Sequence, residues 1–428
     1  SKVGDYFNDL ALSAFGHLRG GPAKATIASG VLFGSISGSS VANVAASGAI
    51  TIPMMRRVGY DRATAGAVEA TSSTGGQITP PILGAGAFLM AEITGIAYAE
   101  IAFAAIIPCI LFYVACYAHV ELHARLHGLH GLPRSELPPL LGLLRKAYLF
   151  APLVIMVWLL VSGYSAFRAG SLAIVAAIVV SWLDRQNAMG PKRSLEALNM
   201  AARDSLQLIS VCAAAGIIVG VIALTGIGGR FAQLLLQLAG ENVLFAMVFT
   251  MIVALILGMG MPTTAAYAIG AAVLAPGLQR LGVPPLVAHM FIFYYAVVSA
   301  ITPPIALASF AAAAIARSDP WKTAFISVKM GLAVFIVPFM FFYSPLLLGQ
   351  GTIWQILPVL ATALIGVLLL ACATEGWFGG KIGWVLRAPL LLAALMLIAP
   401  EGITDIVGIA IAIGVFLVAR LMRNAAPA

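Results

Sequence analysis

The stretch ITPPI stands at residues 78–82 and again, letter for letter, at residues 301–305. Its two adjacent prolines lack the backbone N–H that a helix needs and therefore interrupt one. The flanking sequences correspond as well, in the same order: FGSISGSSVAN (33–43) with LGMGMPTTAAY (257–267) upstream, and IIPCILFY (106–113) with IVPFMFFY (336–343) downstream. Three matching anchors predict an internal duplication.

The composition places this duplication in a lipid bilayer. Hydrophobic residues make up 61% of the 428 and charged residues only 9%, with a mean hydropathy of +1.02, whereas soluble domains carry roughly a quarter charged residues. A helix needs about 20 residues to cross the hydrocarbon core. Candidate apolar runs lie at 98–118, 147–163, 204–225, 321–348, 353–373, 384–399 and 403–422. We therefore predict an all-α polytopic membrane protein.

Both units contain segments that an ordinary membrane helix lacks. Two pairs of apolar segments are too short to cross and are predicted to form re-entrant helical hairpins: 24–37 with 41–55 through Gly38-Ser39-Ser40, and 244–257 with 265–275 through Gly258–Thr264. TSSTGGQITPP (71–81) and VVSAITPP (297–304) are each predicted to break the next apolar segment, because glycines, hydroxylated residues and two prolines cannot hold a rigid helix. Unwound backbone at membrane depth must be buried in protein or line a cavity.

These features predict a binding chemistry. Carbonyls at the C-terminal end of a half-helix coordinate a hard cation, amides at an N-terminal end hold an anion, and hydroxyl oxygens add neutral cation ligands. We predict a sodium site in each unit and one anionic substrate between them. The predicted ion-binding residues are Gly38, Ser39, Ser40, Ser72, Ser73, Thr74, Gly75, Gly76, Gly258, Gly260, Pro262, Thr263, Thr264, Ser299 and Thr302. Candidates for substrate contact or coupling are Asn43, Glu69, Gln77, Thr79 and Tyr295.

Helix packing is the alternative role for small residues. Gly34 with Gly38 and Gly216 with Gly220 have GxxxG spacing, which favours packing over ligand binding. The duplicated clusters favour binding, because packing requires neither a doubled proline nor hydroxyl groups at matched positions. Glu69 lies two residues before the predicted break and fits either ion or proton coupling or a buried hydrogen-bonding role.

The distribution of charge predicts an orientation. The net charge of +8 is spread over the ends of apolar runs, as topology signals are, so lipid headgroups and not nucleic acid are the expected partners. The first hairpin is flanked by more basic residues, which marks its cytoplasmic side: Arg19, Lys24, Arg56, Arg57 and Arg62, against Arg230 and Arg280 at the second. Opposite insertion of equivalent hairpins describes an inverted-topology repeat, which is typical of alternating-access transporters.

Residues 32–96, with FGSISGSSVAN and TGGQITPP, and residues 257–325, with LGMGMPTTAAY and ITPPI, resemble the large membrane subunit of the tripartite ATP-independent periplasmic (TRAP) transporters. Glu69 with TGGQITPP is closer to the TAXI branch, in which the small and large membrane subunits are often fused. The resemblance spans about residues 10–348. It implies an elevator-type secondary transporter of a bacterial inner membrane that imports an organic acid delivered by a periplasmic substrate-binding protein. The chain has no GxxxxGK[ST] motif, which agrees with drive by a Na⁺ or H⁺ gradient, and no other cofactor is expected.

The family's first helices and the small-subunit region are missing from this sequence. We therefore expect it to begin partway through a longer protein, and a small membrane subunit or a fused equivalent to be a partner. Three apolar segments between 353 and 422 are additional. The predicted division is an arm at 1–23, a first repeat at 24–125, connecting and scaffold helices at 126–225, a second repeat at 226–348 and extra membrane helices at 349–428.

Histidines and cysteines suggest other chemistry. Four histidines share one helical face with the spacing of a transition-metal site, but the charged residues among them favour a solvated juxtamembrane helix: His119, His123, His127 and His130. The cysteines form no CxxC pair and are predicted to be small core residues: Cys109, Cys116, Cys212 and Cys372.

Three other functions compete with the TRAP interpretation. An elevator-type dicarboxylate or citrate symporter would work without a binding protein. An intramembrane metallohydrolase would use the histidines. A passive channel is disfavoured, because two hairpins with paired cation sites serve coupling. We expect a transporter and not an enzyme.

Overall fold

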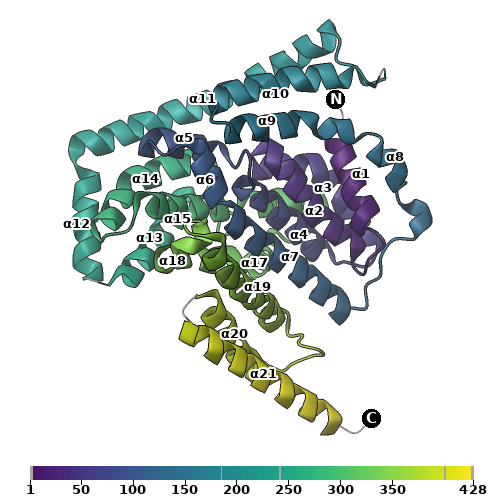
Figure 1. The fold of residues 1–428 in the computed structure, drawn as a ribbon, viewed down its shortest axis with the longest axis vertical. Coiled ribbons are helices and arrows are strands. Elements are labelled where there is room, and N and C mark those ends of the chain that lie inside the picture. Colours follow the sequence, from purple (N-terminus) through teal and green to yellow (C-terminus); the bar gives the residue numbers. More distant parts are fainter. Residues whose placement is uncertain (1–2, 185, 241, 400–401, 426–428) are drawn as a thin grey trace.

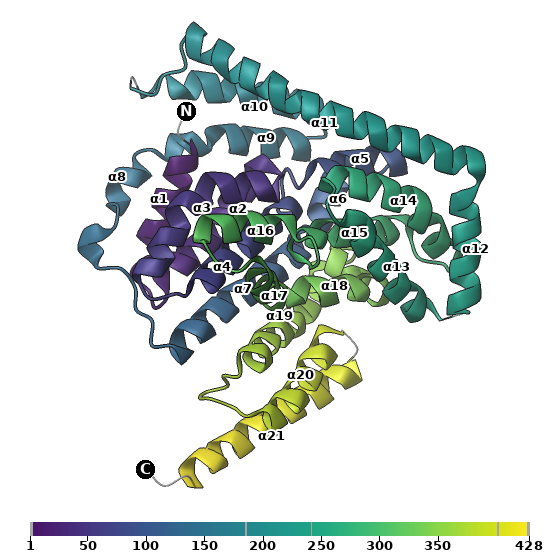
Figure 2. The same ribbon diagram turned by 180° about the vertical axis from the view of Figure 1, so that it is seen from behind.

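The computed structural model describes residues 3–184, 186–240, 242–399 and 402–425. Over these ranges the chain is helical apart from its loops and one isolated β-bridge, between Trp377 and Lys381. Three helices project from one end of the main body (Figures 1 and 2): α19 (Ile353–Glu375), α20 (Trp384–Ile398) and α21 (Gly402–Ala425). The all-α prediction is confirmed for this part of the chain.

Within the described ranges, four helical stretches are long and apolar enough to cross a membrane: Tyr98–Leu126, Pro191–Thr225, Ile353–Glu375 and Gly402–Met422. The run expected at 147–163 follows a bend of 71° between Arg134–Leu144 and Ala147–Val161, whereas the run expected at 321–348 contains a second bend, of 42°. The second bend falls at Gly331, where a Cβ atom would lie 2.9 Å from the Ile301 side chain. The close packing of that side chain therefore favours glycine at the bend.

The first half contains a pair of packed helices, α2 (Gly21–Ser37) and α3 (Ser40–Arg57). Gly38 between them has a φ of +61°, a left-handed value that glycine adopts without a Cβ clash. Ser39 then caps α3 by accepting the Ala42 N–H at 3.4 Å. The short joint predicted at 38–40 is therefore present, and it is formed by residues suited to a helix end.

A helix in two pieces follows this pair. α4 (Arg62–Gly75) continues as a 3-10 turn, η1 (Gly76–Ile78), and the chain then loses helical structure before α5 (Ala85–Thr94). Asp61 caps α4, because its carboxylate accepts the backbone N–H groups of Ala63 and Thr64 at 3.1 and 3.2 Å.

The second half has the same order of elements. α13 (Val243–Gly258) and α14 (Thr263–Arg280) form the packed pair, and α15 (Pro285–Val298), η4 (Ser299–Ile301) and α16 (Leu307–Ala316) form the interrupted helix. Leu83 and Ala306, at corresponding positions after the doubled prolines, have positive φ values of 58° and 36°. The two breaks therefore share an unusual backbone conformation as well as a sequence.

Both breaks begin later than predicted. Residues 71–78 and 297–301 remain helical, so the unwound stretches are only 79–84 and 302–306. Thr74 donates to the Ala70 carbonyl at 2.8 Å within α4, which is compatible with helix. A glycine costs a helix only about 1 kcal/mol, less than the surrounding packing supplies, whereas proline removes a donor outright. The prediction that the serines, threonines and glycines unwind the helix is wrong.

The helix after each break packs against the other half, on one helix of its packed pair and on its interrupted helix. α5 contacts α14 and α15, and α16 contacts α3 and α4. Figure 2 shows α16 beside α3 and α4, and α5 beside α14. The two halves therefore exchange one helix each and form a single core.

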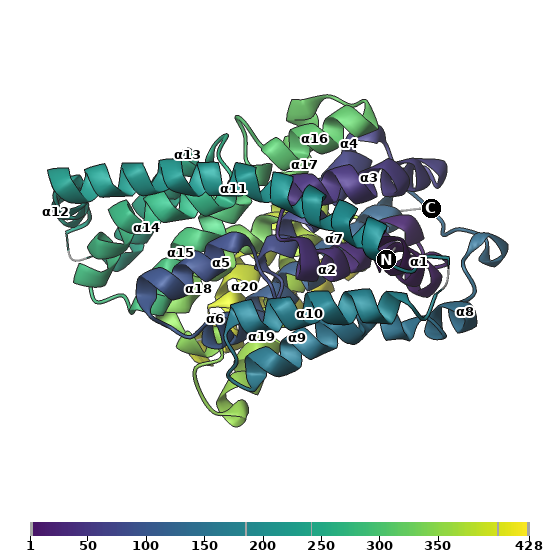
Figure 3. The ribbon, with the colours of Figure 1, turned by 90° about the horizontal axis from the view of Figure 1, so that it is seen from above.

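The remaining helices precede, connect or follow these elements of the two halves. They are α1 (Val3–Phe15), α6 (Tyr98–Ala104), α7 (Ile106–Leu126), η2 (Arg134–Glu136), α8 (Leu140–Leu144), η3 (Ala147–Phe150), α9 (Ala151–Val161), α10 (Ala166–Ser181), α11 (Pro191–Thr225), α12 (Ile227–Ala239), α17 (Pro320–Met330), α18 (Leu332–Tyr343) and η5 (Pro345–Leu348). The long α11 runs across one side of the body (Figure 3).

Much of α11 is exposed, as Leu224 at 89% illustrates. Cys212 on this helix is exposed too, so its prediction as a core residue is wrong, whereas Cys109 and Cys116 are buried. A Cβ added at Gly216 or Gly220 would meet no atom within 4 Å, so these glycines pack against no other described part of the chain. An apolar helix exposed to lipid explains this arrangement.

Candidate functional site

Gln77 joins the two halves at the ends of their packed pairs. Its Nε2 donates to the Ser40 hydroxyl at 3.3 Å, and its Oε1 accepts the Thr263 hydroxyl at 2.7 Å. Ser40 is the first residue of α3 and Thr263 the first of α14. One side-chain amide from η1 therefore bridges the N-terminal ends of two helices 223 positions apart in the sequence.

The C-terminal ends of α2 and α13 each approach the 3-10 turn of their own half, α2 at η1 and α13 at η4. A Cβ at Gly34 would lie 2.1 Å from the Gly76 Cα, and a Cβ at Gly258 would lie 2.3 Å from the Ser299 Oγ. The Ser299 hydroxyl donates to the Gly258 carbonyl at 3.1 Å. Glycine is therefore required at both contacts. Two carbonyl ends and two amide ends of helices converge around η1 and η4, which combines both signs of the helix dipole in a small region.

Several of the predicted hydroxyl groups donate to backbone carbonyls. Ser72 donates to Thr26 of α2 at 3.0 Å, while Thr79 and Thr302 donate to Gly75 and Val298 at 2.8 Å in matched positions. A donating hydroxyl keeps its oxygen lone pairs, so it remains a potential neutral ligand for a cation.

Glu69 is buried, with 1% of its surface exposed, and is surrounded by hydroxyl donors. Its Oε1 accepts Ser47 at 2.5 Å and Ser73 at 3.1 Å, and its Oε2 accepts Thr51 at 2.5 Å. Ser47 and Thr51 were not singled out from the sequence, although their i, i+4 spacing places them on one face of α3. The hydrogen-bonding role of Glu69 is visible in these contacts, and its role in coupling stays a prediction.

Asn43 and Thr79 lie at the edge of the same region. Asn43 accepts the Ser37 hydroxyl through Oδ1, while its buried Nδ2 has no hydrogen-bond partner among the described residues. Thr79 also donates to the Tyr113 hydroxyl at 3.2 Å, which in turn donates to the Ser72 carbonyl at 3.3 Å. Tyr113 links α7 to the first break, and only its place in the IIPCILFY anchor hinted at such a role.

The remaining candidates of the second half lie near the start of α14, except for Tyr295, which contacts α18. Gly260 has a φ of +75° in the loop before α14, Pro262 precedes the first residue of that helix, and Thr264 is buried. Tyr295 is buried among aromatic rings and donates to the Phe335 carbonyl in α18 at 2.6 Å. Its hydroxyl therefore faces a different element from the Gln77 bridge.

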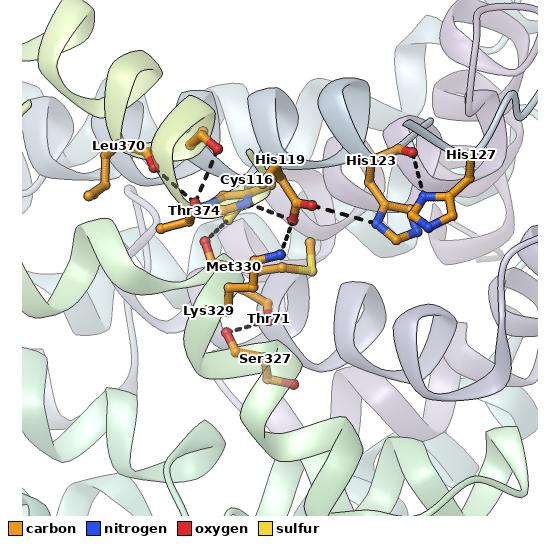
Figure 4. Close-up of polar contacts among 12 residues, drawn as sticks. Thr71, Cys116, His119, His123, His127, Ser327, Lys329, Met330, Leu370 and Thr374 are labelled. Atoms are coloured by element: carbon orange, nitrogen blue, oxygen red, sulfur yellow. Dashed lines mark hydrogen bonds and ion pairs between the residues drawn. The ribbon is translucent and has the colours of Figure 1, made fainter. Parts of the chain in front are cut away.

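The histidine face differs from its prediction. His119 is buried, with 2% exposed, because α7 extends to Leu126 and packs against α19. The Glu375 carboxylate lies 3.2 Å from His119 Nδ1, 2.8 Å from Lys329 Nζ and 3.8 Å from His123 Nδ1 (Figure 4). A solvated helix is therefore wrong for His119. No group of three or more histidine, cysteine or acidic side chains within the described ranges is arranged to hold a metal ion.

The family follows from the match of the whole core. A sequence model of the family described as "Tripartite ATP-independent periplasmic transporter, DctM component" matches residues 1–356, which include both packed pairs and both breaks. The chain belongs to this DctM family. DctM proteins are large permease subunits integral to the inner membrane, and they work with a periplasmic binding protein and a small membrane subunit.

Several curated DctM relatives are similar to the chain. The C4-dicarboxylate TRAP transporter large permease of Pseudomonas aeruginosa is 29% identical over 72% of this chain and 71% of its own length. The ectoine TRAP transporter large permease of Halomonas elongata is 25% identical over 77% and 75%. The isethionate TRAP transporter permease DctMQ of Oleidesulfovibrio alaskensis is 25% identical over 72% of this chain and 49% of its own length. These relatives are transporter permeases and not enzymes.

Proposed function

We propose that this DctM-family chain is the permease of a secondary active transporter that imports an organic acid across the bacterial inner membrane. A periplasmic substrate-binding protein delivers the acid, and a Na⁺ or H⁺ gradient drives its uptake. The observation that carries the proposal is the Gln77 bridge between Ser40 and Thr263. It brings the ends of both predicted re-entrant hairpins to one place, where a substrate and coupling ions could meet helix ends of both signs.

The proposed ligand chemistry follows from these helix ends. The amide ends of α3 and α14 favour a carboxylate between them. The carbonyl ends of α2 and α13, with the neighbouring serine and threonine oxygens, favour a hard cation such as Na⁺ in each half. A C4-dicarboxylate and isethionate, named for two relatives, are anions of the type that such a site accepts.

The proposed mechanism is an elevator built on an inverted repeat. Exchange of α5 and α16 between the halves, with the matched order of helices, supports a pseudo-two-fold relation between them. In this proposal the two hairpins insert from opposite membrane faces, and the body that carries the site moves as a unit. Glu69 and the TGGQITPP stretch favour the TAXI branch, with the small membrane subunit either fused or separate.

Uptake by proteoliposomes, with separately imposed Na⁺ and pH gradients, tests this function. We expect uptake of an organic acid only when a matching binding protein is present, and a reduced Na⁺ dependence in Ser39→Ala and Thr263→Ala. Glu69→Gln should abolish drive by the pH gradient if protons are coupled. Thr225→Ala is the matched control, because that hydroxyl is exposed and bonds within its own helix.

Two results would contradict the proposal. Uptake that is equally fast without any binding protein would point to a symporter that works alone. Unchanged coupling in both Ser39→Ala and Thr263→Ala would show that these hydroxyl groups are not ligands of the coupling ions.

A further inference from the structure

A groove with a charged end lies outside the region around Gln77. It has a volume of about 530 Å³ and is bordered by α1, α2, α7 and α19, with Lys24, Ile27, Tyr117, Leu122, Arg125 and Leu368 among its lining residues. Its lining on α7 extends from Tyr113 to Arg125, which at 1.5 Å per residue is about 18 Å along the helix axis. Small-molecule sites in proteins typically have volumes of about 300–1,000 Å³.

Two cations share one carboxylate at one end of this groove. Lys24 Nζ and Arg125 Nε each lie 2.5 Å from an oxygen of Glu121. Lys24 is 4% exposed, and its ammonium group lies 4.9 Å from the centre of the Tyr117 ring. Lysine carries three N–H donors and arginine five, so this end has a net charge of +1 and more donors than Glu121 accepts. An additional anionic group would complete it.

The rest of the groove is apolar and runs between helices of membrane length. α7 belongs to the stretch Tyr98–Leu126 and α19 is Ile353–Glu375, both long and apolar enough to cross a bilayer. Lys24 and Arg125 lie at the end of the molecule whose basic residues predict the cytoplasmic face. The groove therefore has positive charge at the membrane interface and an apolar channel that extends into the membrane. A phospholipid has the matching arrangement, with a charged headgroup and apolar acyl chains.

We propose that this groove binds one anionic phospholipid. Its phosphate accepts hydrogen bonds from Lys24 and Arg125, and an acyl chain lies along α7 toward Tyr113. Basic pockets between membrane helices on the cytoplasmic side suit anionic headgroups. Leu368 and Cys372 of α19, which form one wall, lie beyond the 1–356 match to the DctM family. The site therefore depends on a part of the chain that the family match does not include.

Native mass spectrometry of the purified chain tests this site directly. The protein is incubated with phosphatidylglycerol or with phosphatidylcholine of identical acyl chains, and the lipids retained per chain are counted. We expect one retained phosphatidylglycerol and little phosphatidylcholine. Arg125→Ala should weaken phosphatidylglycerol retention about fivefold, since a basic residue near an anionic lipid surface contributes about 1 kcal/mol.

Two further variants test separately how the basic end of the groove and its apolar channel contribute to lipid retention. Arg57→Ala is the matched control, because Arg57 is an exposed basic residue outside the groove, paired with Glu136 at 2.6 Å, and it should retain lipid as the wild type does. Leu368→Trp narrows the apolar channel and should reduce retention while the melting temperature shows that the fold is intact. Equal retention of both lipids, or retention unaffected by Arg125→Ala, overturns the proposal. So does photo-crosslinking from position 368 in membranes that captures a protein subunit and no lipid.

Discussion

Among single residues, Gln77 stands out because its side chain hydrogen-bonds to both halves of the chain. It is buried, with 4% exposed, and its amide uses one donor and its acceptor on the two halves of the chain. A neutral amide suits this position because it can donate to Ser40 and accept from Thr263 at the same time. A carboxylate could not donate, and an ammonium group could not accept.

Replacement of Gln77 by leucine should therefore impair transport. Loss of both hydrogen bonds leaves the buried Ser40 hydroxyl and the partly buried Thr263 hydroxyl without this partner, at a cost of about 1–3 kcal/mol. If the transport transition state loses this much stabilisation, uptake should fall roughly 5- to 150-fold. Gln279→Leu is the control, because Gln279 is an exposed glutamine at the end of α14. Initial uptake rates in proteoliposomes decide the matter, and equal rates in the two variants would contradict a role for the bridge.

Gly34 shows a second residue-scale requirement. A Cβ there would lie 2.1 Å from the Gly76 Cα, so Gly34→Ala must push α2 away from η1, at a typical cost of 1–3 kcal/mol for overpacking. Gly216→Ala is the matched control, because it adds a methyl group to an open helix surface and should stabilise α11 by about 0.5–1 kcal/mol. We expect the melting temperature to fall in the first variant and to hold or rise in the second. A Gly34→Ala protein as stable as the wild type would show that the contact can relax.

At the scale of elements, the docking of α19 depends on a buried charge. Glu375 lies at the end of α19, and its partners come from α7 and from α17, which follow the first and second breaks. One carboxylate therefore connects the C-terminal helices to both halves of the core (Figure 4). Such a contact is more sensitive to the loss of one partner than to the removal of both.

Glu375→Gln should lower the melting temperature by leaving Lys329 without its carboxylate. Lys329 is 39% exposed, so water screens part of the effect and we expect a loss of about 2 kcal/mol, below the full cost of a buried broken pair. Addition of Lys329→Met should recover part of this loss. Glu136→Gln breaks the exposed Arg57 pair and should cost less than about 1 kcal/mol. If the two glutamine variants melt alike, the buried pair does not hold α19.

At the scale of the whole molecule, the two halves are related by exchange. α5 leaves its own half and packs against α14 and α15, and α16 packs against α3 and α4. Neither half can fill its core without the helix of its counterpart. The inverted repeat proposed above makes a further statement, about the orientation of the two halves in the membrane, and this can be measured.

Single cysteines at the ends of α3 and α14 should report opposite membrane faces. With the four native cysteines replaced, Arg57→Cys and Arg280→Cys place thiols at exposed positions that end equivalent helices. We expect a membrane-impermeant maleimide to label Arg280→Cys in spheroplasts and Arg57→Cys only in inverted vesicles. Labelling of both variants from the same face would contradict the inverted topology on which the proposed transport mechanism depends.

The predicted outline of the core agrees with much of the structure. Polar joints near Gly38 and Gly258, and doubled prolines at 80–81 and 303–304, mark helix ends through local backbone chemistry, so they could be recognised without a fold. The length of helix before each doubled proline could not be predicted from the sequence, because tertiary packing overcomes the weak helix propensities of serine, threonine and glycine. The same limit explains why Ser47, Thr51 and Tyr113 were missed.

Composition and local motifs were enough to predict the bilayer environment, the helical class and the two matched interruptions. These follow from hydropathy, and from proline and glycine geometry, which act within a few residues of the chain. Three features could be seen only in the folded structure. Gln77 hydrogen-bonds to both Ser40 and Thr263. α5 and α16 each pack against the opposite half, and Glu375 pairs with His119 and Lys329. Contacts between residues far apart in the chain depend on how whole helices pack, and no local pattern encodes that packing.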